Sequence, residues 1–367
     1  MAARPKTVYR GNRKYSWIIT LVVFVLVILI ITAVWLFYYL QRYLVYDKDR
    51  VRLVLPAERA ETFPTETEPT GLPAGFTPVD VEIVVDPADY SDVQTSAGEG
   101  LSPIRAIFVS AENVKQGNLD FYAAGLGDFN AIVLELKGPD GMLRYRSGIP
   151  FADSYGVNGA LELGAAVEAL KAQDVRVVAQ LSALVDGTMA VRNAPIALQD
   201  ARSGKPFRDA DGRAWLDPYS ETLRAYLTAL LQDLHDLGFD EVILGDLWCP
   251  DNENVRFSQA MTETPDRVSA VSSLALYLRK QADEIGITLS AVVDPAALVA
   301  GTNEAIGQDP AVFFKAFDRV TFDMSGADYT ACFDLLSRAL DRPADEDRRI
   351  VPSAAGFSPD FESFIVR

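Results

Sequence analysis

Residues 215–250 read WLDPYSETLRAYLTALLQDLHDLGFDEVILGDLWCP, and this stretch decides the fold. Asp217 precedes a proline, the pattern of a helix N-cap followed by a first helical residue whose missing N–H costs nothing. Apolar residues then recur at spacings of three and four, and Gly238 marks the end of the helix. The apolar run 242–244 is typical of a strand that is buried on both faces in a parallel sheet. The stretch therefore predicts a helix and then a strand, with Asp246 at the carboxyl end of the strand.

A second stretch, residues 17–40, holds 24 consecutive residues without a charge. At about 1.5 Å per residue a helix of this length reaches roughly 36 Å, enough to cross a hydrocarbon core of about 30 Å. Residues 1–16 contain five basic and no acidic residues, and no small-residue cleavage site follows the apolar stretch. We therefore expect a signal anchor: a cytoplasmic basic tail (1–16), one transmembrane helix (17–40) in the cell membrane, and an extracytoplasmic remainder.

The charge and the residue counts exclude several classes of function. The chain carries −17 at pH 7, and because residues 1–16 contribute five positive charges, the exported part carries −22. Such acidity disfavours nucleic acid as a partner and favours a well-solvated domain. The chain has one histidine, His235, and two distant cysteines, Cys249 and Cys332. These predict neither a metal site nor a disulfide framework, although one disulfide between the cysteines stays open, and no glycine-rich loop indicates a nucleotide cofactor.

Residues 41–102 connect the expected span to the folded part. Between Pro56 and Pro78 they are rich in Pro, Thr and Glu and poor in apolar residues, which is typical of an extended spacer. From 103 to 367 strands and helices alternate with short connections, the pattern of a parallel sheet with helices outside. The expected strands are 104–109, 131–136, 175–181, 242–244, 287–293, 320–324 and 350–353, and the expected helices are 119–126, 160–172, 217–237, 268–285, 310–317 and 329–340.

This alternation predicts an α/β fold, a (β/α)8 TIM-barrel-like domain, for which about 250 residues is a typical size. Only seven strands can be counted from Ile104 before the chain stops at Arg367. Either residues 79–85 supply the eighth strand, or the barrel is open or incomplete at its carboxyl end.

The order of the motifs resembles that of the "Putative glycosyl hydrolase domain" family of bacterial exported and membrane-anchored proteins, over about residues 104–357. The resemblance implies a TIM-barrel fold and cleavage of glycosidic bonds. The matching pieces are RAIFVSA (105–111), FNAIVLELK (129–137) followed by DG (140–141), VVA (177–179), AWLDPY (214–219), GFDE (238–241), LSA (289–291) and IGQD (306–309).

Compared with that family, the chain departs at several positions of the expected cleft. The resemblance places the family's strand-end Asp on Gly245 and its Arg on Trp248, whereas Asp246 comes one residue late. Because side chains alternate along a strand, this displacement sends the carboxylate to the other face unless a bulge re-aims it. The family's next Asp falls on Val292, with Asp294 two places on.

Hydrolysis of a glycosidic bond ordinarily uses two carboxyl groups, about 5–5.5 Å apart for retention and about 6.5–9.5 Å apart for inversion. In a barrel such groups sit at the carboxyl ends of strands, where this chain offers Glu135, Asp246, Asp294 and Asp323. We predict Glu135 and Asp246 as the catalytic pair. Lys137 shares parity with Glu135 and is expected to form an ion pair with it at the barrel mouth. A purely structural ion pair at Glu135 and a capping or loop role for Asp246 are the alternatives.

The remaining candidates are assigned to substrate binding. Trp215 and Trp248 offer flat apolar rings on which a sugar could stack, although packing in the core or at the rim would explain them as well. Lys137, Asp294 and Asp323 complete the set. Asp294 precedes a proline and therefore also fits a helix N-cap.

Three hypotheses of function follow. The first is a membrane-anchored, extracytoplasmic glycoside hydrolase that cleaves a cell-envelope or extracellular polysaccharide. The second is a barrel of the same descent that has lost turnover and binds a glycan or an envelope partner. The third is a scaffold that only stands off the membrane on its spacer. The first requires two carboxylates within about 10 Å of each other at the barrel mouth.

Overall fold

The structure is a computed structural model. It describes residues 21–26, 44–47, 50–53, 100–115, 117–259, 265–324, 333–334, 336–338, 343–355 and 361–367. The chain divides into two compact units, Met1–Val85 and Asp86–Arg367.

In the first unit, residues 21–26 are helical, and strands β1 (Leu44–Asp47) and β2 (Arg50–Leu53) form an antiparallel pair. This pair was not expected from the sequence. The described ranges contain no helix that is both long and apolar enough to cross a membrane. Of the predicted span 17–40 only residues 21–26 are described, while the predicted spacer at 56–78 and the alternative eighth strand at 79–85 lie outside the described residues.

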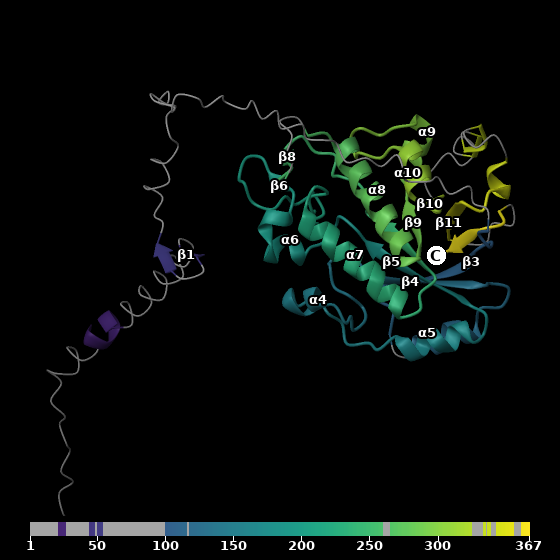
Figure 1. The fold of residues 1–367 in the computed structure, drawn as a ribbon, viewed down its shortest axis with the longest axis horizontal. Coiled ribbons are helices and arrows are strands. Elements are labelled where there is room, and N and C mark those ends of the chain that lie inside the picture. The colour runs from purple at the N-terminus through teal and green to yellow at the C-terminus, as the bar shows by residue number, and fades with distance from the viewer. Residues whose placement is uncertain are drawn as a thin grey trace, which may run out of the picture. The chain divides into compact units, whose positions relative to one another are not determined.

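The second unit is a closed barrel of eight parallel strands (Figure 1). In the order in which they pair, the strands are β10 (Arg319–Asp323), β11 (Ile350–Ala354), β12 (Phe364–Val366), β3 (Arg105–Val109), β4 (Ala131–Lys137), β5 (Arg176–Ser182), β7 (Glu241–Gly245) and β9 (Thr288–Val292). Most of their residues are buried apolar side chains, as expected for a parallel sheet covered on both faces. The predicted TIM-barrel architecture is confirmed.

The barrel is complete at its carboxyl end, contrary to the expectation of an open or incomplete sheet. β12 is the eighth strand, and its Ile365 pairs with Ser353 of β11 on one side and Ala106 of β3 on the other. The Phe364 amide donates to the Ile104 carbonyl at 2.7 Å. A strand of three residues is too short to show an alternation of buried and exposed side chains. β12 is therefore recognised by the strands that pair with it and not by its sequence.

The helices lie outside the barrel, and α7 and α8 pack against each other (Figure 1). The described helices of this unit are α3 (Asn118–Ala124), α4 (Pro150–Ser154), α5 (Gly164–Lys171), α6 (Met189–Arg192), α7 (Glu221–Asp236), α8 (Arg267–Ile285), α9 (Pro295–Ala300) and α10 (Pro310–Ala316), with 3-10 turns η1 (Ala194–Ile196) and η2 (Ala344–Glu346). Of the predicted helix 329–340, only residues 333–334 and 336–338 are described, and they are helical.

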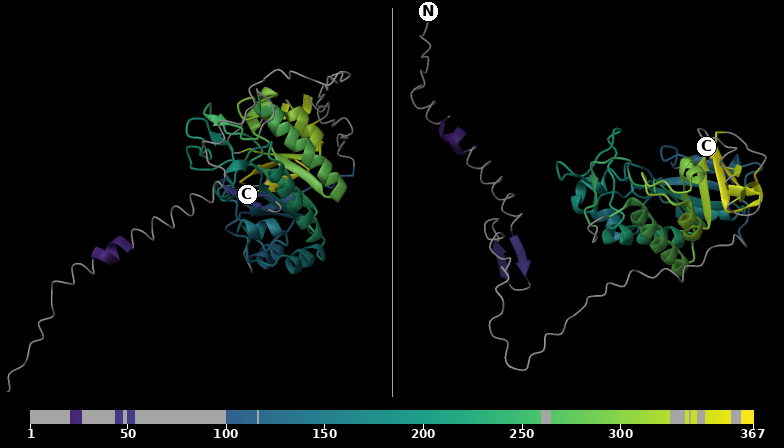
Figure 2. Two further views of the ribbon diagram at one scale, coloured as in Figure 1. Left: turned by 60° about the vertical axis from the view of Figure 1, so that its left-hand side comes forward. Right: turned by 90° about the horizontal axis from the view of Figure 1, so that it is seen from above.

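An extension beside the barrel carries α6, η1 and a small antiparallel sheet of β6 (Gln199–Asp200) and β8 (Val255–Arg256). It projects to one side of the domain in both views of Figure 2. β6 belongs to the connection after β5, and β8 belongs to the connection after β7. Because both connections leave the carboxyl ends of their strands, the extension belongs to the face of the barrel where active sites form.

Helix α7 begins later than predicted. Its N-cap is Ser220, whose hydroxyl accepts from the Leu223 amide at 3.3 Å. Asp217, predicted as the cap, is fully buried and accepts instead from the amides of Ser258 at 2.6 Å and Gln259 at 2.9 Å. The Asp-Pro pattern therefore marks a residue that accepts locally from the Tyr219 amide at 2.9 Å and also fixes the connection after β7.

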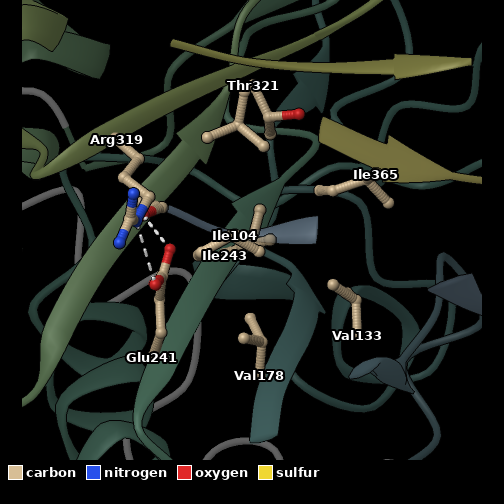
Figure 3. A pocket seen from close by; sticks show the side chains of 10 residues that line it. Ile104, Val133, Val178, Glu241, Ile243, Arg319, Thr321 and Ile365 are labelled. Atoms are coloured by element: carbon tan, nitrogen blue, oxygen red, sulfur yellow. Dashed lines mark hydrogen bonds and ion pairs between the residues drawn. The ribbon is translucent and has the colours of Figure 1, made fainter. Parts of the chain in front are cut away.

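Inside the barrel, side chains from alternate strands form layers, as in other barrels of this type (Figure 3). The ladder register defines two adjacent layers: one of Val133, Ile243, Thr321 and Ile365, and one nearer the amino-terminal end of Ala106, Val178, Ser290 and Val351. The core is therefore filled, with space for about one water molecule.

A buried ion cluster closes the amino-terminal end of the barrel (Figure 3). Glu241 lies 3.2 Å from the Arg319 guanidinium and 3.3 Å from that of Arg176, and it accepts from the Ser290 hydroxyl at 2.6 Å. Burial lowers the pKa of Arg319, and the Glu241 carboxylate opposes this shift. Since every carboxylate oxygen of Glu241 is used, the cluster serves the fold and leaves the other end of the barrel for chemistry.

Candidate active site at the mouth of the barrel

Strand parity places two acidic side chains inside the carboxyl-terminal mouth. Val133 of β4 and Thr321 of β10 line the interior, and Glu135 and Asp323 lie two residues further along the same strands. Both therefore face the interior. Glu135 is partly buried, and Asp323 is exposed.

Glu135 and Asp323 also lie at the same level of the barrel. From Glu135, the ladders through β5, β7 and β9 lead to Arg319, four residues before Asp323. From Asp323, the ladders through β11, β12 and β3 lead to Ala131, four residues before Glu135. In a closed barrel the strands are tilted, so paired residues on successive strands shift steadily along the barrel axis. The shift is four residues in both directions around the barrel, and Glu135 and Asp323 therefore lie at the same height on opposite strands.

The same register completes the layer at the mouth with Gly245 and Arg367. Following the paired residues across two strands from Glu135 leads to Ile243, and Gly245 lies two residues further along that strand. Following them across two strands from Asp323 leads to Ile365, and Arg367 lies two residues further along. The uppermost layer thus consists of Glu135, Gly245, Asp323 and Arg367. The guanidinium of Arg367 lies over the Phe108 ring, 4.8 Å from its centre.

The expected separation of the two carboxyl groups follows from the geometry of the barrel. Eight strands spaced about 4.8 Å apart and tilted by about 36° enclose a ring roughly 15 Å across. Extended Glu and Asp side chains reach roughly 4 Å and 3 Å inward from opposite sides. Two carboxyl groups extended in this way from opposite strands would be about 8 Å apart, which is within the range of inverting hydrolases.

Gly245 leaves the third position of this layer without a side chain. The Gln180 amide nitrogen lies 3.5 Å from the point where a Cβ on Gly245 would stand, so the carboxamide borders that space. Val292, the second position where the resemblance expects an Asp, lies one layer lower with Gln180, Phe108 and Ser353. The two family carboxylates are therefore absent from interior positions of this mouth.

The two residues predicted as the catalytic pair, Glu135 and Asp246, make separate hydrogen bonds. Glu135 accepts from the Ala111 amide at 2.9 Å, just beyond β3. Asp246 accepts from the Ser182 hydroxyl at 2.6 Å, at the end of β5. Because β3 and β5 flank β4 on opposite sides, the two carboxylates are anchored to different neighbours of β4.

The Asp246 side chain is redirected by an unusual backbone conformation and not by the β-bulge considered above. It adopts φ +51°, in the left-handed region that non-glycine residues seldom enter. Its carbonyl accepts from the Leu184 amide at 3.2 Å, and its carboxylate holds Ser182. Asp246 therefore links the ends of β7 and β5, a role that stabilises the rim of the mouth.

Lys137 does not pair with Glu135. The ladder shifts register between the two residues, so Lys137 aligns with Leu181 rather than with the interior position. Its ammonium group lies 2.9 Å from the Asp186 carboxylate and donates to the Ser182 carbonyl at 2.7 Å, and both charged side chains are fully buried. A side chain with this burial cannot contact a substrate, so the assignment of Lys137 to substrate binding is wrong.

The other predicted binding residues have different surroundings. Trp215 is 2% exposed and donates to Asp209 at 3.2 Å, so it packs in the core and offers no face to a sugar. Trp248 is partly exposed and packs against the core, which leaves it as a rim aromatic. Asp294 accepts from the Ala296 amide at 2.7 Å as the N-cap of α9, as its alternative role predicted.

Several residues of the mouth were not identified from the sequence. Ser182 and Arg367 enter it through strand register, which the sequence does not display. Arg144, paired with Asp140 at 2.7 Å, lies on the same side of Gly138 as the Glu135 carboxylate. The Asp140-Gly141 motif after β4 is the sequence feature that could have pointed to Arg144.

An eight-stranded parallel barrel with acidic side chains facing one another at its carboxyl-terminal mouth is the architecture of TIM-barrel enzymes. The family model described as "Putative glycosyl hydrolase domain" matches residues 106–346, and the chain belongs to this family.

Several solved structures share the fold. The PgaB (BpsB) glycoside hydrolase domain from Bordetella bronchiseptica is 16% identical, with a TM-score of 0.53 over 69% of this chain and 84% of that chain. A hypothetical protein from Ruminiclostridium thermocellum is 22% identical, with a TM-score of 0.45 over 50% and 96% of the two chains. Ega3 from Aspergillus fumigatus, solved with galactosamine, is 12% identical, with a TM-score of 0.42 over 73% and 94%. No curated protein matches. At 16% identity the likeness to the Bordetella domain shows the fold alone.

Proposed function

We propose that the barrel is an extracytoplasmic glycoside hydrolase that cleaves a cell-envelope or extracellular polysaccharide with inversion, using Glu135 and Asp323 as its carboxyl pair. One observation carries the proposal: these two side chains face the same mouth from opposite strands at the same level. Membership of the family and the shared fold support it.

The chemistry needs one carboxylic acid and one carboxylate on opposite sides of the scissile bond. The acid protonates the leaving oxygen, while the carboxylate removes a proton from a water molecule that attacks the anomeric carbon from the other face. A gap of about 8 Å leaves room for that water, whereas direct attack by a carboxylate needs about 5 Å. The separation of Glu135 and Asp323 therefore favours inversion.

The proposed location follows from the amino-terminal sequence. The uncharged stretch 17–40 would hold the chain in the cell membrane, and residues 41–102 would let the barrel reach glycan outside it. A polymer at the cell surface is a substrate that an anchored enzyme can meet repeatedly without diffusing.

The test measures release of reducing ends from an envelope polysaccharide preparation by the full-length protein in detergent. Wild type should release them, and Glu135→Gln should lower the rate by roughly 10²- to 10⁴-fold, the usual contribution of general acid–base catalysis. Asp128→Asn, an exposed carboxylate away from the mouth, is the matched control and should behave as wild type. Equal rates for wild type and Glu135→Gln would refute the assignment.

Proton NMR of the first-formed sugar tests the stereochemistry independently. Inversion predicts that the new reducing end appears first as the anomer opposite to the bond that was cleaved. Retention would require a carboxyl group about 5 Å from its partner and would contradict the proposed pair.

A second candidate function is glycan binding without turnover. The vacant position at Gly245 and the apolar Val292, where the family places acids, favour it. This candidate predicts that wild type retains the polysaccharide on a column but releases no reducing ends at any pH.

A further inference from the structure

A groove of about 650 Å³ lies between the connection after β7 and the connection after β9. Both connections leave the carboxyl ends of their strands, so the groove belongs to the same face of the barrel as the mouth. Its size is within the range of ligand sites, about 300–1,000 Å³. The side chains that could meet a ligand there are Arg256, Phe257, Asp266, Thr302 and Glu304.

Phe257 supplies a fixed aromatic surface in this groove. Its ring meets that of Tyr219 edge-on, with centres 5.3 Å apart and an angle of 75° between the planes. Phe257 remains only partly buried. The contact with Tyr219 holds the Phe257 ring in place, and an aromatic ring that is partly exposed suits the apolar side of a sugar ring.

The polar groups beside Phe257 carry balanced charge. Arg256 is exposed and is held by the Gln199 side chain at 3.0 Å across the small sheet. Glu304 and Thr302 are exposed on the opposite wall. The lining side chains carry two guanidinium groups, two carboxylates and one hydroxyl, and this balance favours uncharged sugar hydroxyls over a strongly anionic or cationic polymer.

The two walls are joined before any ligand arrives. Arg267 donates to the Asn252 carbonyl at 2.7 Å on one wall and to the Ala305 carbonyl at 2.9 Å on the other. Asp217 fixes the amides that follow Phe257, at Ser258 and Gln259. Groups held in this way lose little freedom on binding, which raises affinity.

We infer that this groove is a distal subsite that binds a run of uncharged sugar units of the polysaccharide, away from the bond that is cleaved. The inference deepens the proposed function and rests on its substrate class. Phe257 stacks on one ring, and Arg256 and Glu304 bind hydroxyl groups on either side of it. The subsite holds the polymer while the mouth acts on another part of the same chain.

The test titrates the full-length protein in detergent with a glucose hexasaccharide and an N-acetylglucosamine hexasaccharide. Wild type should bind at least one of them, and Phe257→Ala should weaken that binding about tenfold, the scale of one ring-stacking contact. Arg256→Ala should weaken it as well. The matched controls are Phe121→Ala, an aromatic ring that is 76% exposed on α3, and Arg202→Ala, an exposed arginine on the turn after β6.

The outcomes separate this inference from the proposed function. If wild type binds neither hexasaccharide, or if Phe257→Ala and Arg256→Ala bind as tightly as the two controls, the subsite is refuted, whatever the enzyme hydrolyses. If binding depends on Phe257 while no reducing ends are ever released, the subsite stands and the hydrolase proposal falls. Circular dichroism of each variant shows whether the fold is retained.

Discussion

The buried pair of Lys137 and Asp186 allows a quantitative prediction. Both side chains are fully buried, with their charged groups 2.9 Å apart. Lys137→Met removes the ammonium group and leaves the Asp186 carboxylate with only two backbone donors, the amides of Thr188 at 3.1 Å and Met189 at 2.7 Å. It also removes the donor of the Ser182 carbonyl. An uncompensated buried charge costs about 3–5 kcal/mol, so we expect the free energy of unfolding to fall by about 4 kcal/mol.

Urea unfolding followed by tryptophan fluorescence measures this loss. Arg146→Met is the matched control, because Arg146 and Glu162 form a pair at 2.8 Å whose side chains are 58% and 74% exposed. An exposed pair should contribute less than about 1 kcal/mol. Adding Asp186→Asn to Lys137→Met should recover part of the loss, since the buried negative charge is removed. A loss under about 1 kcal/mol for Lys137→Met, equal to that of Arg146→Met, would refute the reasoning.

Three further predictions concern single residues. Asp217→Ala should cost about 2 kcal/mol, because it leaves partly buried amides without their charged acceptor, and limited proteolysis should then cut the connection after β7. Partial burial opposes ionisation of Asp209, but the Arg213 amide and guanidinium lower its pKa. The stability this adds is therefore present above the ordinary pKa of Asp and lost as the pH falls through the folded-state value, so Asp209→Asn should be less stable than wild type at pH 7, and the difference, measured by tryptophan fluorescence, should shrink as the pH falls through that value. Gly141→Ala should prevent stable folding, measured as soluble yield, because φ is +80° and the new methyl group would overlap the buried Asp186 carboxylate.

The parts of the fold that the sequence predicts are those with strong local patterns. The apolar stripe of α7 and the apolar run of β7 identify both elements without knowledge of their partners, and their boundaries agree to within a few residues. The eighth strand could not be found in this way. Ile365 belongs to a strand only because β11 and β3 hydrogen-bond to its neighbours, and the contacts with β3 join residues more than 200 positions apart.

The site was harder to predict because it depends on register. Glu135 was identified by its place at the end of a strand, but its partner was taken to be Asp246, which is nearer in sequence to the family's motif. The ladders instead bring Asp323 level with Glu135. Lys137 was misassigned for the same reason, since a register shift after Glu135 turns it toward Asp186.

The central claim is tested most directly by measuring the hydrolysis rates of the Asp323→Asn and Asp246→Asn variants on the same polysaccharide. Both substitutions replace one carboxylate by an amide of the same shape, and both residues lie at strand ends around the mouth. The structure predicts a loss of roughly 10²- to 10⁴-fold for Asp323→Asn and less than tenfold for Asp246→Asn, which affects only the rim contact with Ser182. The opposite order, with Asp246→Asn inactive and Asp323→Asn near wild type, would contradict the assignment of Glu135 and Asp323 as the carboxyl pair.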